Sequence, residues 1–169
     1  VDIGVNYYLG EIGVTRALNQ PWLEAVTLKA SVEVLGGDGA VTVGKGKVAR
    51  AFQTPLGTNH AFQGWADRFL TTPADGVVDV YGTLAVKTMG ANLMVVYHDF
   101  DAERGGYDYG SEWDVQLTRP FFEHYTLGIK LARYEASGNA LNLARNGAAS
   151  AGKQAYDLTK LWLWAEMKF

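Results

Sequence analysis

The chain contains no cysteine among its 169 residues, so neither a disulfide framework nor a cysteine-ligated metal site is available. It also lacks any apolar run close to the roughly 18 residues that a membrane helix needs. The net charge is -3, with both signs interspersed along the sequence, which gives no electrostatic footprint for nucleic acid. The sequence therefore predicts no membrane helix, no disulfide scaffold and no nucleic-acid partner.

Motifs of catalytic sites are also missing. There is no Gly-x-Ser-x-Gly elbow and no phosphate-binding loop. The three histidines, His60, His98 and His124, are scattered along the chain without the paired spacing of a zinc motif. A barrel phospholipase would need a lipid-facing serine beside a histidine, whereas His98 has inward parity. We expect that the protein is not an enzyme and needs no cofactor.

Aromatic residues and glycine are abundant instead. Aromatic residues make up 12% of the chain, and there are 20 glycines, as in barrels with aromatic girdles and tight strand contacts. No shift in composition marks a linker, so residues 1–169 are treated as one domain.

The last stretch, residues 154–169, alternates most clearly. Counting back from Phe169, every second residue as far as Leu161 is apolar, whereas the positions between them include lysine, glutamate and tryptophan. A period of two predicts a strand. Charges on one side do not fit a parallel strand that is buried on both faces. They fit an outer-membrane barrel, where the apolar side meets lipid and the mixed side meets the lumen.

Strands are predicted in the same way elsewhere, at residues 26–34, 78–87, 93–97, 112–118 and 125–132. The start of the chain allows two interpretations, because the apolar parity changes between Leu9 and Ile12. Gly10 marks either a bulge in one long strand or a tight turn between two strands. Seven strands would indicate a piece of a larger barrel, since closed single-chain bacterial barrels are even-numbered. Eight would allow a small closed barrel whose interior is filled by side chains.

Residues 36–76 are predicted to be one long loop, because they contain glycine-rich segments and two prolines without sustained alternation. Within this loop, residues 60–70 are expected to form a short helix, with Asn59 as the cap and aromatic residues at helical spacing. Long connections of this kind are usually functional or disordered. The aromatic content argues against disorder.

The connections alternate in length. They are short at residues 19–21, 89–92 and 120–124, and longer at 36–76, 99–108 and 136–153. Outer-membrane barrels show this rhythm, with short periplasmic turns and longer external loops. If the C-terminus lies at the periplasmic end, every short turn falls on that side. The predicted fold is all-β, an antiparallel transmembrane β-barrel with seven or eight strands in this chain.

Four segments together resemble the C-terminal part of outer-membrane proteins of the alginate-export family: VEVLGGDG, AFQTPLGTNHAFQGWADRFLTTPADGVVDVY, VVYHDFDAERGGYDYGSEWD and LTKLWLWAEMKF. The resemblance covers most of the chain from about Val26 onward, and the combination is more specific than any one piece. It implies a barrel of about 18 strands in the outer membrane of a Gram-negative bacterium, acting as a porin or polysaccharide channel. This chain is too short for such a barrel, so we expect it to be the C-terminal portion of a longer polypeptide.

The alternation predicts which side chains face the lumen. The pore-lining candidates are Lys29, Glu33, Asp79, Lys87, Glu112, Asp114, Lys130, Lys160, Trp162, Trp164 and Glu166. Charged rings set ion selectivity in pores, but the same charges could form an ion-pair network that holds a barrel together. Trp162 and Trp164 could offer flat faces to sugar rings, or they could pack against an inward-folded loop.

A weaker signal lies in the loop at residues 99–108. Asp99, Asp101 and Glu103 crowd oxygen ligands together, as calcium prefers, but Gly110 stands where an EF-hand loop has its bidentate glutamate. We therefore predict no metal site and a solvated acidic loop.

The aromatic C-terminus suggests an assembly partner. Phe169, with Met167, Leu163 and Leu161 in the same alternation, resembles the signal by which barrel-assembly machinery recognises its clients. The remaining expected partners are outer-membrane lipid, lipopolysaccharide and small-molecule solutes.

Three functions compete at this point. The leading one is an outer-membrane channel for passive diffusion of small or anionic solutes, saccharides among them. The alternative is a non-conducting structural or binding barrel whose loop at residues 36–76 engages a partner or surface polymer. A soluble lipocalin-like carrier is disfavoured, because its outside would have to take Trp162 and Trp164.

Overall fold

The computed structural model describes residues 4–43, 46–54, 62–137 and 156–169, and all regular structure in these ranges is β-strand. The strands are β1 (Tyr7–Gln20), β2 (Leu23–Leu35), β3 (Gly37–Val43), β4 (Gly46–Ala51), β5 (Val77–Thr88), β6 (Ala91–Asp101), β7 (Asp108–Phe121), β8 (Tyr125–Ala136) and β9 (Leu158–Met167). In the described ranges, no helix is long and apolar enough to cross a membrane.

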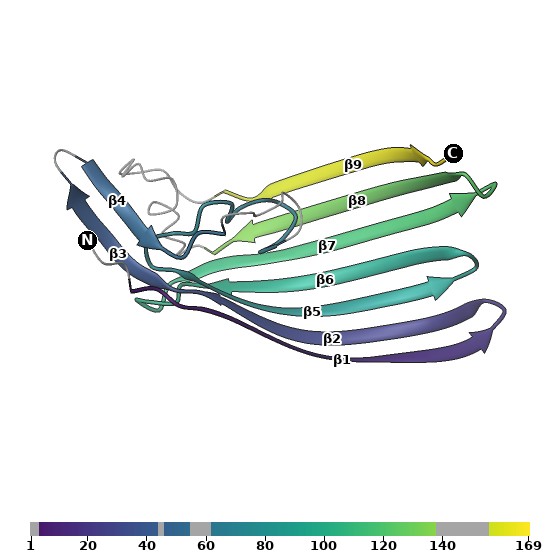
Figure 1. Ribbon diagram of the computed structural model, residues 1–169, viewed down its shortest axis with the longest axis horizontal. Helices are drawn as coiled ribbons and strands as arrows, with labels where there is room; N and C mark the ends of the chain where they lie inside the picture. The colour runs from purple at the N-terminus through teal and green to yellow at the C-terminus, as the bar shows by residue number, and fades with distance from the viewer. Residues whose placement is uncertain (1–3, 44–45, 55–61, 138–155) are drawn as a thin grey trace.

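Seven strands form one antiparallel sheet in the order β1-β2-β5-β6-β7-β8-β9, and β3 pairs with β4 in a separate hairpin (Figure 1). The prediction of an all-β antiparallel fold is confirmed. Among the described residues the sheet is open, with β1 and β9 as its two edges. Closure into a barrel therefore belongs to the proposal below.

The connections alternate as expected. All three short turns lie at the end of the sheet where the chain finishes, and β2, β6 and β8, which precede the longer connections, end at the opposite side of the sheet (Figure 1). Between β5 and β6, Met89 and Gly90 both have positive φ, 48° and 75°. Two such residues are what a tight type I′ hairpin turn requires.

Strand β1 runs through Gly10 without interruption, so the interpretation of one long strand is confirmed, whereas the bulge and the tight turn at Gly10 were wrong. Gly10 pairs with Val32, and its neighbours Leu9 and Glu11 keep the same register. The apolar parity changes because β1 meets different surroundings along its length. Near its start, the inward Tyr7 stacks on Phe52, with ring centroids 5.0 Å apart, so an aromatic residue is favourable on that face.

The helix predicted at residues 60–70 was wrong for its described part. Residues 62–70 form bends and turns, and Gln63, Gly64 and Asp67 have φ of 50°, 79° and 57°. A right-handed helix does not contain such residues. The cap Asn59 and residues 60–61 lie outside the described residues.

The β3–β4 hairpin was not predicted from the sequence. It occupies residues 37–51, which were assigned to the long loop because glycines interrupt their alternation. Gly37 lies so close to the other end of this connection that a Cβ atom would be 2.3 Å from the Gly76 nitrogen. The chain therefore leaves the sheet after β2 and returns to it before β5 at the same place, where Gly37 and Gly76 are in contact.

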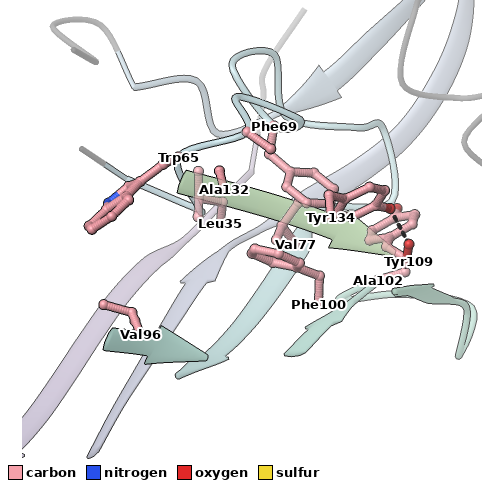
Figure 2. Packing of buried hydrophobic residues seen from close by; sticks show 11 residues of the cluster. Leu35, Trp65, Phe69, Val77, Val96, Phe100, Ala102, Tyr109, Ala132 and Tyr134 are labelled. Carbon is pink, nitrogen blue, oxygen red and sulfur yellow. Dashed lines mark hydrogen bonds between the residues drawn. The ribbon is translucent and has the colours of Figure 1, made fainter. Parts of the chain in front are cut away.

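The hydrophobic core lies on one face of the sheet, beneath residues 62–76. Phe69 is the centre of this packing (Figure 2), with its ring centroid 4.6 Å from that of Phe100 and 5.6 Å from that of Tyr109. Trp65 and Ala66 join the same cluster. We call residues 62–76 the inner loop and the face that it covers the inner face.

Candidate functional site

Strand pairing places all the pore-lining candidates on the inner face. Paired residues of an antiparallel sheet project from the same side, and one cross-strand row runs through Lys29, Thr83, Val96, Asp114, Ala132 and Lys160. Neighbouring rows pair Glu33 with Asp79 and Lys130 with Trp162. Lys87 and Trp164 share a third row, which passes through Asn92, Thr118 and Gly128. Glu112 is two positions from Asp114 and Glu166 is two positions from Trp164, so both also project from the inner face.

The opposite face, which we call the outer face, is mainly apolar and uncovered, and the exposed Arg16, Arg119 and Arg133 also lie on it. Its central row contains Val14, Leu28, Leu84, Val95, Val115, Leu131 and Leu161. Val14 and Leu161 are 64% and 60% exposed. A continuous exposed apolar surface on a folded protein marks an interaction with another apolar phase or partner.

Aromatic residues border this apolar surface at both ends. On the loop side, Tyr97 and Trp113 are cross-strand partners whose ring centroids are 4.8 Å apart. On the turn side, Phe121 pairs with Tyr125, and Phe122 is 85% exposed. Trp113 and Phe121 are eight positions apart on β7, about 26 Å at roughly 3.3 Å per residue. On strands tilted by about 35–45°, as in outer-membrane barrels, this separation corresponds to about 19–22 Å of height, somewhat less than their apolar band of about 25 Å.

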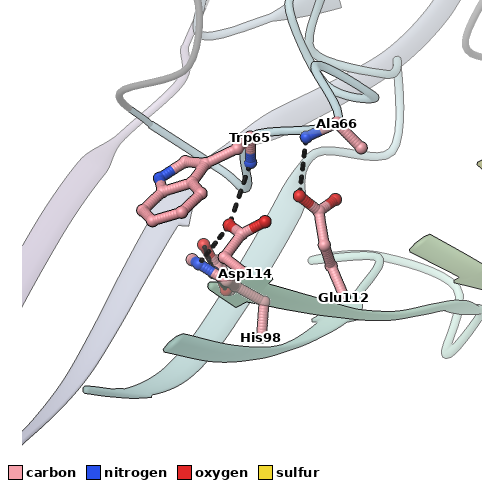
Figure 3. A network of polar contacts seen from close by, with 6 residues as sticks. Trp65, Ala66, His98, Glu112 and Asp114 are labelled. Atoms are coloured by element: carbon pink, nitrogen blue, oxygen red, sulfur yellow. Dashed lines mark hydrogen bonds and ion pairs between the residues drawn. The ribbon is translucent and has the colours of Figure 1, made fainter. Parts of the chain in front are cut away.

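Two buried carboxyl groups on β7 hold the inner loop (Figure 3). The Trp65 backbone N–H donates to Asp114 Oδ2 at 3.0 Å, and the Ala66 N–H donates to Glu112 Oε1 at 2.6 Å. Because Glu112 and Asp114 are two positions apart on a strand, they project from the same side. Both are 0% exposed. These residues act here as loop anchors rather than as groups at an open surface.

His98 extends the carboxyl pair across the sheet. Its Nδ1 lies 2.9 Å from both carboxyl oxygens of Asp79, and its Nε2 lies 3.6 Å from Asp114 Oδ2. The ring is also stacked between Tyr81 and Phe100, at centroid distances of 4.9 and 5.3 Å. The histidine on β6 thus lies between carboxyl groups on the two strands that flank it, β5 and β7.

Lysines hold the inner loop from the other side. Lys160 Nζ lies 2.8 Å from Asp67 Oδ2. Lys130 Nζ lies 4.0 Å from the centroid of Trp65 and 5.8 Å from that of Trp162, within the range of cation–π attraction. Trp162 therefore lies beside the inner loop, as the packing alternative for this residue expected.

Trp164 does not share the environment of Trp162, because its ring lies against a glycine on β8. It is the cross-strand partner of Gly128, and a Cβ atom added to that glycine would lie 2.1 Å from Cζ2 of the indole. The ring thus occupies the space of the absent side chain, an arrangement in which an aromatic residue covers a glycine on the neighbouring strand. One face of this indole is already in contact with protein.

The predicted lumen charges fall into two groups. Glu33, Asp79, Glu112 and Asp114 are 3% exposed or less. The side chains of Lys87 and Glu166 are 56% and 49% exposed, and Lys87 pairs with Glu24 at 2.7 Å. The four buried acidic candidates have hydrogen-bond partners within the protein, and the open part of the inner face carries both signs of charge.

The weak calcium candidate does not assemble into a site. Glu103 accepts a hydrogen bond from the Gly37 N–H at 3.3 Å, and among the described residues no three acidic or histidine side chains could hold a metal ion. Asp101 lies at the loop end of β6, outside the apolar band. Partial burial, followed by the Asp99 and Asp108 charges, raises its pKa.

Sequence reasoning missed the role of the inner loop. The apolar spacing of Trp65, Ala66 and Phe69 was noticed but assigned to a helix. Their strand partners, including Tyr134, whose hydroxyl donates to the Tyr109 carbonyl, could not be identified from local alternation. The inward parity of His98 and of the carboxyl residues Asp79, Glu112 and Asp114 was the available signal for the buried network.

Comparison of the chain with protein-family models, with characterised proteins and with solved structures gives no match. The resemblance to the alginate-export family therefore stays a prediction.

Proposed function

We propose that the chain forms part of a transmembrane β-barrel in the outer membrane of a Gram-negative bacterium, a channel of the alginate-export type for passive diffusion of small or anionic solutes, saccharides among them. One observation carries the proposal. The sheet has an exposed, mainly apolar face between two aromatic borders, and most of its charged and polar residues lie on the other face. This two-sided pattern is that of barrel strands between lipid and lumen.

The energetic argument concerns the outer face. Burying one large aliphatic side chain is worth about 1.5–3 kcal/mol, and the central row alone contains one apolar residue from each strand of the seven-stranded sheet. In water these side chains would favour aggregation. Contact with lipid removes that cost without any additional protein layer.

The edges of the sheet support closure with further strands. β1 and β9 are long edge strands, which would otherwise be open to edge-to-edge pairing. Because the order is antiparallel and contains seven strands, β1 and β9 run in the same direction. An odd number of additional strands is needed to close an antiparallel barrel. Any even total meets this requirement, including the about 18 strands that the resemblance implies.

The inner face supports a polar path that is narrowed by the inner loop. Near the turns, the exposed Lys87 and Glu166 share this face with Asn92 and Thr118. Towards the other end, the inner loop covers the same face through its contacts with Glu112 and Asp114. A solute would therefore meet a wide polar section and then a constriction.

The same proposal assigns the remaining partners. The outer face would contact outer-membrane lipid and lipopolysaccharide. Phe169 is fully exposed, and Met167, Leu163 and Leu161 lie on the outer face of β9. This terminus would serve as the assembly signal for the barrel-assembly machinery.

Conductance across a planar bilayer tests the channel. The purified full-length barrel that contains this chain, inserted into the bilayer, is expected to give discrete single-channel steps, and the same protein denatured before addition serves as the control. If the natively folded protein inserts but gives no steps, passive diffusion through it is wrong.

A non-conducting barrel is the second candidate, and the packing of the inner loop favours it. Phe69 is 2% exposed and Trp65 is 7% exposed, so the loop covers the face as a packed layer. In this case the connection at residues 36–76 engages a partner or surface polymer. Removing this connection would then abolish binding and leave permeability unchanged, whereas removing a constriction from a channel would increase conductance.

A further inference from the structure

Each short turn of the sheet exposes a large apolar side chain. Trp22 lies in the turn between β1 and β2, Met89 in the turn between β5 and β6, and Phe122 in the turn between β7 and β8. These residues are 63%, 69% and 85% exposed, and we call them the tip residues. All three turns lie at the same end of the sheet (Figure 1), which we call the turn end. The turn end therefore carries one exposed apolar side chain for each hairpin.

The backbone makes two of the tip residues unfavourable choices for a turn surrounded by water. Met89 and Phe122 have φ of 48° and 47°, in the left-handed region that glycine and asparagine adopt most readily. The turn between β1 and β2 shows the ordinary solution, because Asn19 takes the positive φ there, at 54°. A bulky side chain in this region costs stability. Since both side chains are largely exposed, a contact outside the described residues would have to offset that cost.

Hydrogen bonds between hairpins fix the positions of two tip residues. The Thr88 hydroxyl donates to the Trp22 carbonyl oxygen, and the Gly90 N–H donates to Glu24 Oε1 at 3.2 Å. Both bonds join the β1–β2 hairpin to the β5–β6 hairpin. Because neighbouring strands are about 4.8 Å apart, successive turns of this sheet are roughly 10 Å apart. The tip residues thus form a spaced row along the turn end rather than one compact patch.

The height of the outer face brings the turns to the edge of a bilayer. On tilted strands, Trp113 and Phe121 are about 19–22 Å apart in height, about 3–6 Å less than the apolar band of outer-membrane barrels. Each further position along such a strand adds about 2.3–2.7 Å of height. The positions just beyond Phe121 therefore reach the edge of the band, and Phe122 is the first of them.

Arg119 indicates the same level for the boundary between lipid and water. It is exposed on the outer face, and its guanidinium carbon lies 5.3 Å from the ring centroid of Phe121, two positions nearer to the turn. Long cationic side chains on apolar surfaces keep their charge toward the polar phase. The direction of Arg119 is the one expected if lipid headgroups lie at the turn end.

We propose that the turn end lies in the headgroup region of the bilayer, where the tip residues contact phospholipid and fix the depth at which the sheet is inserted. The inference rests on the proposed function, because it takes the outer face to be in lipid. A membrane boundary follows the whole rim of a barrel and meets every hairpin, as the spaced row requires. A protein partner would instead favour contacts gathered at the centre of one patch. Tryptophan is also typical of membrane–water interfaces.

Depth-dependent quenching tests the inference in the full-length barrel that contains this chain, reconstituted in vesicles of phosphatidylethanolamine and phosphatidylglycerol. This chain contains no cysteine, so single cysteines can carry a fluorescent label once any cysteine elsewhere in the protein has been replaced. Headgroup nitroxides should quench labels at Met89→Cys and Phe122→Cys several-fold more strongly than a label at Arg104→Cys. Arg104, whose side chain is 55% exposed, lies between β6 and β7 at the opposite end of the sheet. Acyl-chain nitroxides should quench a label at Leu117→Cys, which reports on the outer face.

Asparagine at the two strained positions gives a test by sign. Met89→Asn places asparagine before Gly90, the pair that a type I′ turn prefers, so in water this change should stabilise the turn. In vesicles we expect the folded-to-unfolded ratio to fall several-fold, because the lipid contact of an apolar side chain is lost. Phe122→Asn should act in the same way. Asn19→Gly is the matched control, because it changes another residue with positive φ without removing an apolar side chain, and should be close to neutral.

The inference is overturned if the Leu117 label is in lipid but the labels at Met89 and Phe122 are quenched only from water. The tip residues would then be assigned to a protein partner. Stabilisation by Met89→Asn or Phe122→Asn in vesicles would also overturn it. A Leu117 label that lies in water would contradict the proposed function together with this inference, so the two failures are distinguishable. Should one variant fail to fold, the label and the substitution at the other turn still decide.

Discussion

Replacing Gly128 by alanine tests where the Trp164 ring lies. In the structure, the added Cβ would be 2.1 Å from Cζ2, 2.2 Å from Cε2 and 2.6 Å from Cη2 of the indole. Carbon atoms pack at about 3.5–4.0 Å, so the whole ring would have to move. Because Trp164 is on an edge strand and is half-buried, it can swing away and lose its packing on the glycine.

The expected magnitude is the balance of two effects. Alanine is favoured over glycine within a strand by roughly 0.5–1 kcal/mol, whereas overpacking of this kind costs about 1–3 kcal/mol. G128A should therefore destabilise the protein by about 0.5–2 kcal/mol. With Trp164→Ala also present the clash is absent, and the same change should be neutral or stabilising. The coupling in this double-mutant cycle should be about 1–3 kcal/mol.

Gly82→Ala is the matched control, because its nearest atom to an added Cβ is the Lys29 carbonyl oxygen at 3.9 Å. It should be neutral or stabilising in both backgrounds. Stability is measured by denaturant unfolding from detergent micelles, followed by circular dichroism. If G128A costs no more than G82A, the indole does not rest on Gly128, and both its faces would be free to contact sugar rings.

Two further predictions concern the inner loop and the contact between Gly37 and Gly76. Phe69→Ala removes a ring that is 2% exposed and packed on Phe100, and should reduce the free energy of unfolding by about 3–5 kcal/mol. Hydrogen exchange should show the loss of protection in residues 62–76. A loss of protection spread evenly over the sheet would contradict this prediction. Gly37→Ala places Cβ 2.3 Å from the Gly76 nitrogen, a backbone atom that cannot swing away, and should cost about 3 kcal/mol or more. In thermal unfolding, Gly37→Ala should lower Tm far more than Gly10→Ala, whose added Cβ would have its nearest contact at 3.6 Å. Equal decreases in Tm would contradict the close approach of Gly37 to Gly76.

The sheet could be predicted from the sequence because its signal is local. In β7, Trp113, Val115 and Leu117 project from the outer face and Glu112 and Asp114 from the inner face, as a period of two requires. The same rule placed His98 correctly. It could not give the strand ends, and β7 extends from Asp108 to Phe121, beyond the predicted 112–118, because pairing with neighbouring strands continues where alternation has faded.

The inner loop could not be predicted because its contacts are non-local. Ala66 and Glu112 are 46 positions apart in the sequence, and no local pattern records such a hydrogen bond. The helical spacing of Trp65 and Phe69 was misleading, because both side chains fill the core from an irregular segment. The error at Gly10 has a related origin. The alternation of apolar residues changes near Gly10 because Phe52 packs on Tyr7 and so makes an apolar residue favourable on the inner face at the start of β1.

The central claim is that the outer face meets lipid, and a parity-matched pair of arginines tests it most directly. Leu117, 42% exposed, lies midway between the aromatic borders on the outer face, and Thr118 is the next residue on the inner face. In phospholipid vesicles, Leu117→Arg should reduce the free energy of unfolding by about 2–4 kcal/mol, the cost at the bilayer midplane, and Thr118→Arg by less than about 1 kcal/mol. Equal effects of the two substitutions, or a neutral Leu117→Arg, would contradict the account.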